Sequence, residues 1–316
     1  MFNNLQKYKL YSQYWHYYYL SRLVGINNTD DCFINSIDKY ITKDSVVTFE
    51  DKNGFVTIEK NLFDSEILGF NCFKINYLFS KDPNNINQKL DLLSQVNNFC
   101  LKNNVNYILN RTLIADNKTI QALETDGYIT TDALITFTRE LDNLNSESFK
   151  HPDYEINLLE KQSNKYFVNL CELSKISFTE DRFHNDPLIL KENADKIYYE
   201  WMLNSCRNTC ENIIVAIDNQ NDLPVGFVIC KIETISNINI GTIVLIATDS
   251  NFRNKNIGYN MLIKSLEFFK DHNVEIVQVG TQLSNIPAQR LYLKLLFKPV
   301  YGSLTLRKYF KSETNE

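Results

Sequence analysis

The segment around residue 255 combines basic side chains, a glycine and the start of a helical pattern. It reads RNKNIG, and apolar residues at helical spacing follow it as far as Lys270. A glycine lets backbone amides approach a phosphate closely, and a helix N-terminus adds partial positive charge. We therefore expect a phosphate-binding loop made of Arg253, Asn254, Lys255, Asn256, Ile257, Gly258 and Tyr259. The alternative is a plain turn before a helix.

A histidine and the thiols are the other side chains with chemical potential. His184 has an intrinsic pKa suited to proton transfer and lies in the segment DRFHND, although a lone loop histidine often has no such role. The seven cysteines form no CxxC pair. Cys206 and Cys210 share a helical face, but no histidine or third cysteine is close to them, so we expect no metal site.

Hydrophobic periodicity predicts the elements that must position these residues. Helical patterns cover 90–101, 163–178, 191–206, 258–270 and 286–295, and strand-like runs cover 71–79, 105–109, 213–217, 225–233, 242–247, 275–280 and 303–309. Residues 45–57 are typical of a hairpin. Helices that alternate with strands, together with consecutive hairpin strands, predict an α/β (α+β) fold with a mixed sheet.

The two halves of the chain resemble each other. VEIVQVGT leads to Asn285, and VNYILNRT leads to Asn117. The offset is 169 residues between positions 112 and 281 and 168 between Asn117 and Asn285, which indicates a duplicated unit, with chance similarity as the alternative. Lys89 takes the place of Gly258 in the first copy. Only the second copy is therefore expected to cradle a pyrophosphate.

Length and composition agree with two domains. The chain has 316 residues, which corresponds to two domains of ordinary size, and the polar connector 141–153 is the candidate boundary. We expect domains at 1–145 and 154–316. The net charge of −5 argues against nucleic acid or an anionic membrane as partner. No signal peptide or membrane span is expected, so the predicted location is cytoplasmic.

The strand at 242–247, the loop after it and the segment TQLSNIPAQRLY together resemble the GNAT family of N-acetyltransferases. The family's Arg/Gln-x-x-Gly-x-Gly/Ala pattern falls on residues 253–258. Asn256 replaces its first glycine, and asparagine tolerates a left-handed backbone. The later Asn-x-x-Ala-x-x-x-Tyr pattern matches Asn285, Ala288 and Tyr292. The resemblance implies acyl-CoA as co-substrate, with Asn285 among the residues that bind it and Tyr292 as general acid for the leaving thiolate. Its implied oxyanion site is the backbone amides of Leu245, Ile246 and Ala247. The alternative for Tyr292 is a ring that only fills the core.

Residues from about 60 to 310 are similar to the dTDP-fucosamine acetyltransferase group. The likeness lies in SFTEDRFHNDPLILKENADKIYYEW, TQLSNIPAQRLY, SLTLRKYF and FDSEILGF. It implies a degenerate GNAT-like N-terminal half and a dTDP-linked aminodideoxy sugar as acceptor. Arg182 and Phe183 would then hold the pyrophosphate and the thymine, with His184 and Gln282 also at the substrate. Asp64, Glu66 and His184 are the candidate bases. The alternatives are solvated turn carboxylates and a surface arginine beside a core phenylalanine.

The resulting expectation is a tandem GNAT-like enzyme without metal or redox cofactor. It would move an acetyl group, or a longer group such as 3-hydroxybutanoyl, from acyl-CoA to the sugar amine in bacterial surface-polysaccharide synthesis. A GNAT that acts on a peptide or protein amine, and a non-catalytic acyl-CoA-binding protein, remain alternatives. A homodimer is left open, and neither nucleic acid nor membrane is expected as partner. Residues 1–55 lie outside the resemblance and are expected only to add aromatic packing surface.

Overall fold

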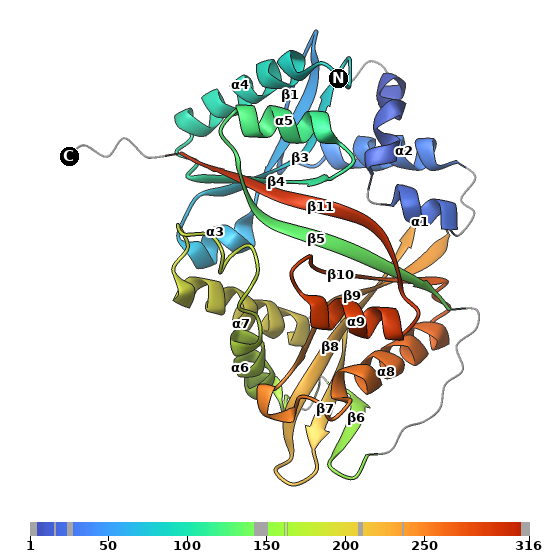
Figure 1. Cartoon of the computed structure of the whole chain (residues 1–316). Coiled ribbons are helices and arrows are strands. Elements are labelled where there is room, and N and C mark those ends of the chain that lie inside the picture. The colour runs from blue at the N-terminus through green and yellow to red at the C-terminus, as the bar shows by residue number, and fades with distance from the viewer. Residues whose placement is uncertain are drawn as a thin grey trace, which may run out of the picture. The chain divides into compact units, whose positions relative to one another are not determined.

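The computed structural model describes residues 5–15, 17–23, 28–141, 151–160, 162, 164–207, 211–235 and 237–310. The chain forms two compact units, the first made of Met1–Leu134 with Tyr301–Glu316 and the second of Ile135–Val300. Both combine helices with a mixed sheet, as the ribbon shows (Figure 1), which confirms the predicted fold class. Within the described residues, no helix is long and apolar enough to cross a membrane.

The first unit is a sheet with strand order β1-β2-β3-β4-β11 followed by the start of β5. Strands β3 and β4 are parallel, whereas β1, β2 and β11 run antiparallel to their neighbours. Its elements are η1 (Leu5–Tyr14), α1 (Tyr18–Leu23), α2 (Thr29–Ile41), β1 (Val46–Asp51), β2 (Gly54–Lys60), α3 (Leu62–Leu68), β3 (Cys72–Ser80), α4 (Ile86–Lys102), β4 (Tyr107–Leu113), α5 (Asn117–Thr125) and β5 (Ile129–Glu140). The predicted hairpin at 45–57 is confirmed as β1 and β2.

The second unit is a sheet with strand order β5-β10-β9-β8-β7-β6, in which β9 and β10 are parallel. Its elements are β6 (Tyr154–Leu158), α6 (Phe167–Ser177), α7 (Lys191–Arg207), β7 (Glu211–Asp218), β8 (Leu223–Ile235), β9 (Ile238–Thr248), η3 (Ser250–Phe252), α8 (Ile257–Asp271), β10 (Ile276–Gln282), α9 (Ile286–Lys294) and β11 (Lys298–Tyr309). Every helix and strand predicted beyond residue 163 is present.

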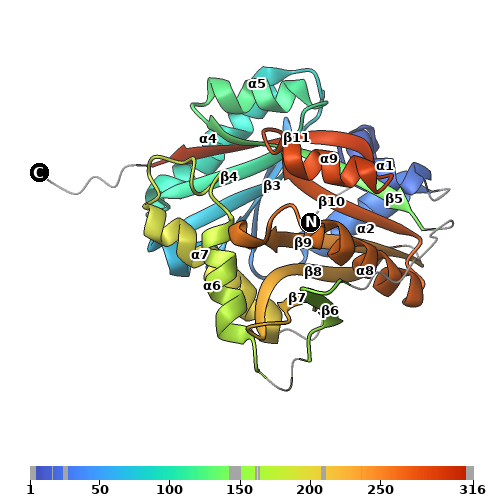
Figure 2. The ribbon, with the colours of Figure 1, turned by 60° about the horizontal axis from the view of Figure 1, so that its bottom comes forward.

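Helices cover both faces of the second unit's sheet. Ile214 and Val228 point to the face that packs against α8, and Ile213 and Phe227 point to the face that packs against α6 and α7. The alternation follows from the two-residue period of a strand. Because both faces are buried, the central strands are continuously apolar. Figure 2 shows α6 and α7 on one side of these strands and α8 on the other.

The internal repeat extends further than the sequence indicated. Strands β4 and β10, helices α5 and α9, and strands β5 and β11 each begin and end 169 residues apart. Both copies also carry a β-bulge, at Asn76 in β3 and at Val244 in β9. The structure corrects one pairing, because the residue that caps α5 in the way Asn285 caps α9 is Asp116 and not Asn117.

The last strands of the two copies are exchanged. Strand β11 pairs antiparallel with β4, from Ser303 opposite Leu113 to Tyr309 opposite Tyr107. The end of β5 lies beside β10, and the amide of Leu141 donates to the carbonyl of Glu275. Each unit is therefore completed by a strand from the other half of the sequence. The unit division differs for this reason from the predicted one at 145 and 154. Of the predicted connector, residues 142–150 lie outside the described residues.

Candidate functional site

A splay between two parallel strands opens the sheet of the second unit. Pairing of β9 with β10 runs from Ile240–Ile276 to Ile243–Val279 and stops there. Both strands continue beyond that point, β9 to Thr248 and β10 to Gln282. The bulge at Val244 bends β9 at the residue where the pairing ends. Backbone groups on this side of β9 therefore have no neighbouring strand.

The register decides which amides face the splay. The amide of Asp249 donates to the carbonyl of Val225 in β8, and antiparallel pairs alternate between bonded and non-bonded residues. The amides of Leu245 and Ala247 consequently point to β8, whereas those of Ile246 and Thr248 point into the splay. Of the three amides expected to form an oxyanion site, the register retains Ile246. It adds Thr248, which sequence reasoning missed because register is invisible in a single strand.

The predicted phosphate loop leads directly from the splay to helix α8. Two of its residues, Asn254 and Asn256, adopt left-handed backbone with φ of 64° and 59°. Asn256 is the N-cap of α8, so asparagine supplies at this position the conformation for which the family pattern has glycine. The amides of Ile257, Gly258 and Tyr259 form the first helical turn, where no intrahelical acceptor exists. The loop can thus present several amides to an anion.

A tyrosine from β6 holds this loop in place. The hydroxyl of Tyr154 donates to the carbonyl of Lys255 (3.0 Å) and accepts from the side-chain amide of Asn260 in α8 (2.7 Å). Lys255 also pairs with Asp153, with 3.3 Å between Nζ and Oδ2. The side chain of Arg253 is exposed. Tyr154 has no motif-like spacing to the loop, a hundred residues later, so the sequence gave no signal for it.

Gly258 is not needed for the fold, which makes its small size informative. Its backbone is helical, and an added Cβ would lie 3.4 Å from Leu291 and 3.7 Å from Thr248, which are ordinary contact distances. Alanine would also favour the helix by about 1 kcal/mol. A glycine at the start of α8, beside the end of β9, therefore fits a cradle that needs room for a phosphate group. This geometry suits the pyrophosphate of CoA.

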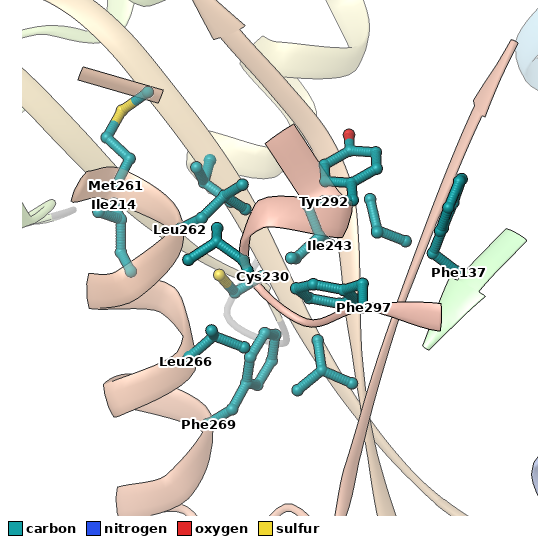
Figure 3. Packing of buried hydrophobic residues seen from close by; sticks show 14 of the residues in the cluster. Phe137, Ile214, Cys230, Ile243, Met261, Leu262, Leu266, Phe269, Tyr292 and Phe297 are labelled. Atoms are coloured by element: carbon teal, nitrogen blue, oxygen red, sulfur yellow. The ribbon is translucent and has the colours of Figure 1, made fainter. Parts of the chain in front are cut away.

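Tyr292 lies on α9 with its ring in the core of the second unit. Its exposed fraction is 1%, and the ring centroid lies 5.7 Å from that of Phe137 and 6.0 Å from that of Phe297. Figure 3 shows the hydroxyl pointing away from the side chains packed below the ring. Burial raises the pKa of this phenol, so it stays protonated at neutral pH. Both expected features, a packed ring and a retained proton, are present in one residue.

Asn285 and Gln282 frame the start of α9. The side chain of Asn285 accepts a hydrogen bond from the amide of Ala288 (3.2 Å) and so caps the helix that carries Tyr292. Gln282 is the last residue of β10, and Gln289 donates to its carbonyl at 3.5 Å. Tyr259 lies under the ammonium of Lys294, 4.6 Å from its ring centroid. Asn285 therefore has a structural role beside the predicted one.

The DRFHND segment folds around its histidine. Nδ1 of His184 lies 2.6 Å from Asp181 and Nε2 lies 3.0 Å from Asp195. Burial alone would lower the pKa of His184, but the hydrogen bonds to the two carboxylates outweigh it and raise the pKa. Since carboxylates occupy both ring nitrogens, neither can accept a proton from a substrate. The geometry is that of a structural clamp and not of a base.

Phe183 and Arg182 also differ from their expected roles. Phe183 is 3% exposed and packs edge-on against Tyr198 at 6.3 Å. Arg182 stacks on the ring of Phe183, with 3.7 Å from the guanidinium carbon to the centroid. The phenylalanine is thus a core residue, as the alternative interpretation held, and its ring is not open for thymine.

The remaining candidate bases belong to the first unit. Asp64 is buried in the first turn of α3, and Glu66 on the same helix is exposed. Their proposed role stays a prediction. Among the described residues, no group of three His, Cys, Asp or Glu side chains is arranged to hold a metal ion, and Cys210 lies outside them.

Comparison with known proteins agrees with the geometry of the second unit. Residues 147–297 match the sequence pattern that defines the Acetyltransferase (GNAT) family. A stretch of 128 residues is 31% identical to the spore coat polysaccharide biosynthesis protein SpsD of Bacillus subtilis (strain 168), over 40% of this chain. The match spans 42% of that relative's length.

Two solved structures resemble nearly the whole chain in fold. A tandem GNAT protein from the clavulanic acid biosynthesis pathway has a TM-score of 0.60 at 11% identity, covering 91% of this chain and 89% of its own. A GCN5-related N-acetyltransferase from Sphaerobacter thermophilus has a TM-score of 0.59 at 9% identity, covering 92% and 91%. Residues 147–297 thus match the GNAT family in sequence, and the chain as a whole has the fold of a tandem GNAT protein.

Proposed function

We propose that the chain is a CoA-dependent N-acyltransferase whose second unit binds the acyl donor. The observation that carries the proposal is the splay of β9 from β10 at the N-terminus of α8. It places unpaired strand amides next to a loop that presents amides to an anion. An extended ligand with a carbonyl and a pyrophosphate, such as acyl-CoA, matches both features.

The residues of the second unit supply most of what acyl transfer needs. Acyl-CoA brings an activated thioester, which a neutral amine attacks at the carbonyl carbon. The amides of Ile246 and Thr248 face the side on which the carbonyl oxygen would gain charge. The hydroxyl of Tyr292 keeps its proton for the departing thiolate. Asp64 and Glu66 remain the proposed proton acceptors for the amine, because the geometry of His184 excludes it.

For the acceptor we propose the amino group of a nucleotide-linked amino sugar. The likeness to SpsD, which is named for polysaccharide biosynthesis, supports a sugar over a peptide amine. The dTDP-linked aminodideoxy sugar follows from the resemblance of the DRFHND segment and remains the finer part of the proposal. The acyl group is acetyl or a short hydroxyacyl.

A mass-spectrometric screen tests the proposal directly. The full chain is incubated with acetyl-CoA or 3-hydroxybutanoyl-CoA and a panel of dTDP-aminosugars, UDP-aminosugars and peptide amines. We expect the acyl mass on a nucleotide sugar, with free CoA released in equal amount. The variant Tyr292→Phe serves as the matched control for enzyme-dependent transfer. Acylation of peptides alone would contradict the sugar, and absence of CoA binding would contradict the activity.

A further inference from the structure

The first unit contains a splay that matches that of the second unit residue by residue. Pairing of β3 with β4 stops at Ile75–Asn110, although β3 continues to Ser80. The amide of Lys81 donates to Asn53 in β2, as that of Asp249 donates to Val225 in β8. By the same alternation the amide of Ser80 points into the first splay, where the equivalent amide of the second unit is that of Thr248.

In the first unit this amide already has a partner from the N-terminal segment. The hydroxyl of Tyr11 accepts from the amide of Ser80 (3.0 Å) and from Nζ of Lys89 (2.9 Å). It also lies 2.9 Å from the Ser80 hydroxyl. Lys89 is the residue equivalent to Gly258 and is fully buried. One oxygen therefore satisfies two donors, at the strand and helix positions that form the candidate donor site in the other unit.

Aromatic packing fixes η1 against the same strand. The ring of Tyr11 stacks on Phe79 with 4.3 Å between centroids, and Tyr8 packs edge-on against Phe55 at 4.7 Å. Both tyrosines are 1% exposed. Phe79 directly precedes Ser80 in β3, so the contacts of η1 concentrate at the end of the strand. An aromatic side chain so placed excludes any extended ligand from that strand end.

We propose that η1 is an internal occupant of the first unit's former donor cleft, with the hydroxyl of Tyr11 in the place of an acyl-donor carbonyl. The proposal rests on the proposed function, which assigns the equivalent cleft of the second unit to acyl-CoA. Three other losses accompany the occupant. The connector from strand to helix has five residues (81–85) where the second unit has eight (249–256), Lys89 replaces Gly258, and Leu123 replaces Tyr292.

The two tyrosines of η1 provide a matched pair for the test. Both lose one buried hydroxyl on substitution by phenylalanine and keep their ring contacts. In Tyr11→Phe, the amide of Ser80 and the ammonium of Lys89 lose their shared acceptor. In Tyr8→Phe no such loss occurs, because the buried Tyr8 hydroxyl has no hydrogen-bond partner among the described residues. The two variants should therefore behave in opposite ways.

Amide hydrogen exchange resolved at Ser80, together with thermal unfolding of the full chain, gives the readout. We expect exchange at Ser80 to accelerate about tenfold in Tyr11→Phe, and the melting temperature to fall by about 2 to 4 °C. Tyr8→Phe should leave exchange at Ser80 as in the wild type. The acyl-transfer rate should stay unchanged in both. Equal protection of Ser80 in the two variants would overturn the proposal.

A second variant covers the outcome that Tyr11→Phe does not fold. Ser80→Pro removes only the amide that Tyr11 accepts from, because that amide faces away from β2. We expect it to fold and to show accelerated exchange across η1, whereas unaltered exchange in η1 would overturn the proposal. None of these measurements uses an acyl donor. Failure of the occupant and failure of the transferase activity are therefore separate results.

Discussion

Tyr292→Phe separates a proton donor from a packing residue with the loss of one oxygen atom. The ring contacts with Phe137 and Phe297 survive the change, and no apolar surface is lost from a residue that is 1% exposed. Stability should therefore change little. If the hydroxyl protonates the leaving thiolate, acyl transfer should slow by about 10²-fold, the lower end of the range for a general acid. This corresponds to about 2.7 kcal/mol in the activation free energy.

The assay must isolate the chemical step. Product release can limit turnover and conceal a slower transfer, so single-turnover rates are compared across pH. Binding of acyl-CoA should stay close to wild type, because the lost interaction develops as the carbon–sulfur bond breaks. Tyr292→Leu, which copies Leu123 of the first unit, provides a second variant without the hydroxyl. Wild-type single-turnover rates in Tyr292→Phe would refute the assignment.

Three further predictions concern the two clefts. Gly258→Val should raise the KM for acyl-CoA at least about tenfold with little change in melting temperature, and unchanged CoA affinity in calorimetry would remove the phosphate cradle. Equilibrium titration should give one acyl-CoA per chain, and a stoichiometry of two would contradict the closed first cleft. Burial lowers the pKa of Lys89 to about 8, so the unfolded chain binds more protons between about pH 8 and 10 and stability contributed by this group rises with pH. Chemical unfolding of Lys89→Met should therefore lack about 2 kcal/mol of that rise between pH 7 and 10, and parallel profiles for the two proteins would show that Lys89 is charged in the fold.

Local patterns predicted the second unit well because its elements are regular. Continuous apolar strands such as β7 and the amphipathic helix α8 carry their structure in residue spacing. The first 45 residues contain aromatic side chains without periodicity, and η1, α1 and α2 were not predicted. Strand β5 was also missed, although β11 lies at the repeat offset of 169 residues and shares its length of 12.

The candidate site was predictable in its loop and not in its details. Asn256 adopts the left-handed backbone expected from its place in the pattern. Which amides of β9 face the splay depends on the register with β8, and a register is a property of two strands. The state of His184 depends on Asp181 and Asp195, and a histidine between two carboxylates is a clamp where a solitary one would be a base.

The exchange of β5 and β11 sets an order on folding during synthesis. The edge of β4 in the first unit receives its partner only when residues 303–309 have been made, almost at the end of the chain. The second unit takes its strand from residues that are already present before its own sheet begins. The unit that is synthesised first is thus the one that must wait, with an unpaired strand edge exposed in the meantime. A truncation near residue 300 should therefore damage the N-terminal unit, far from the cut in sequence.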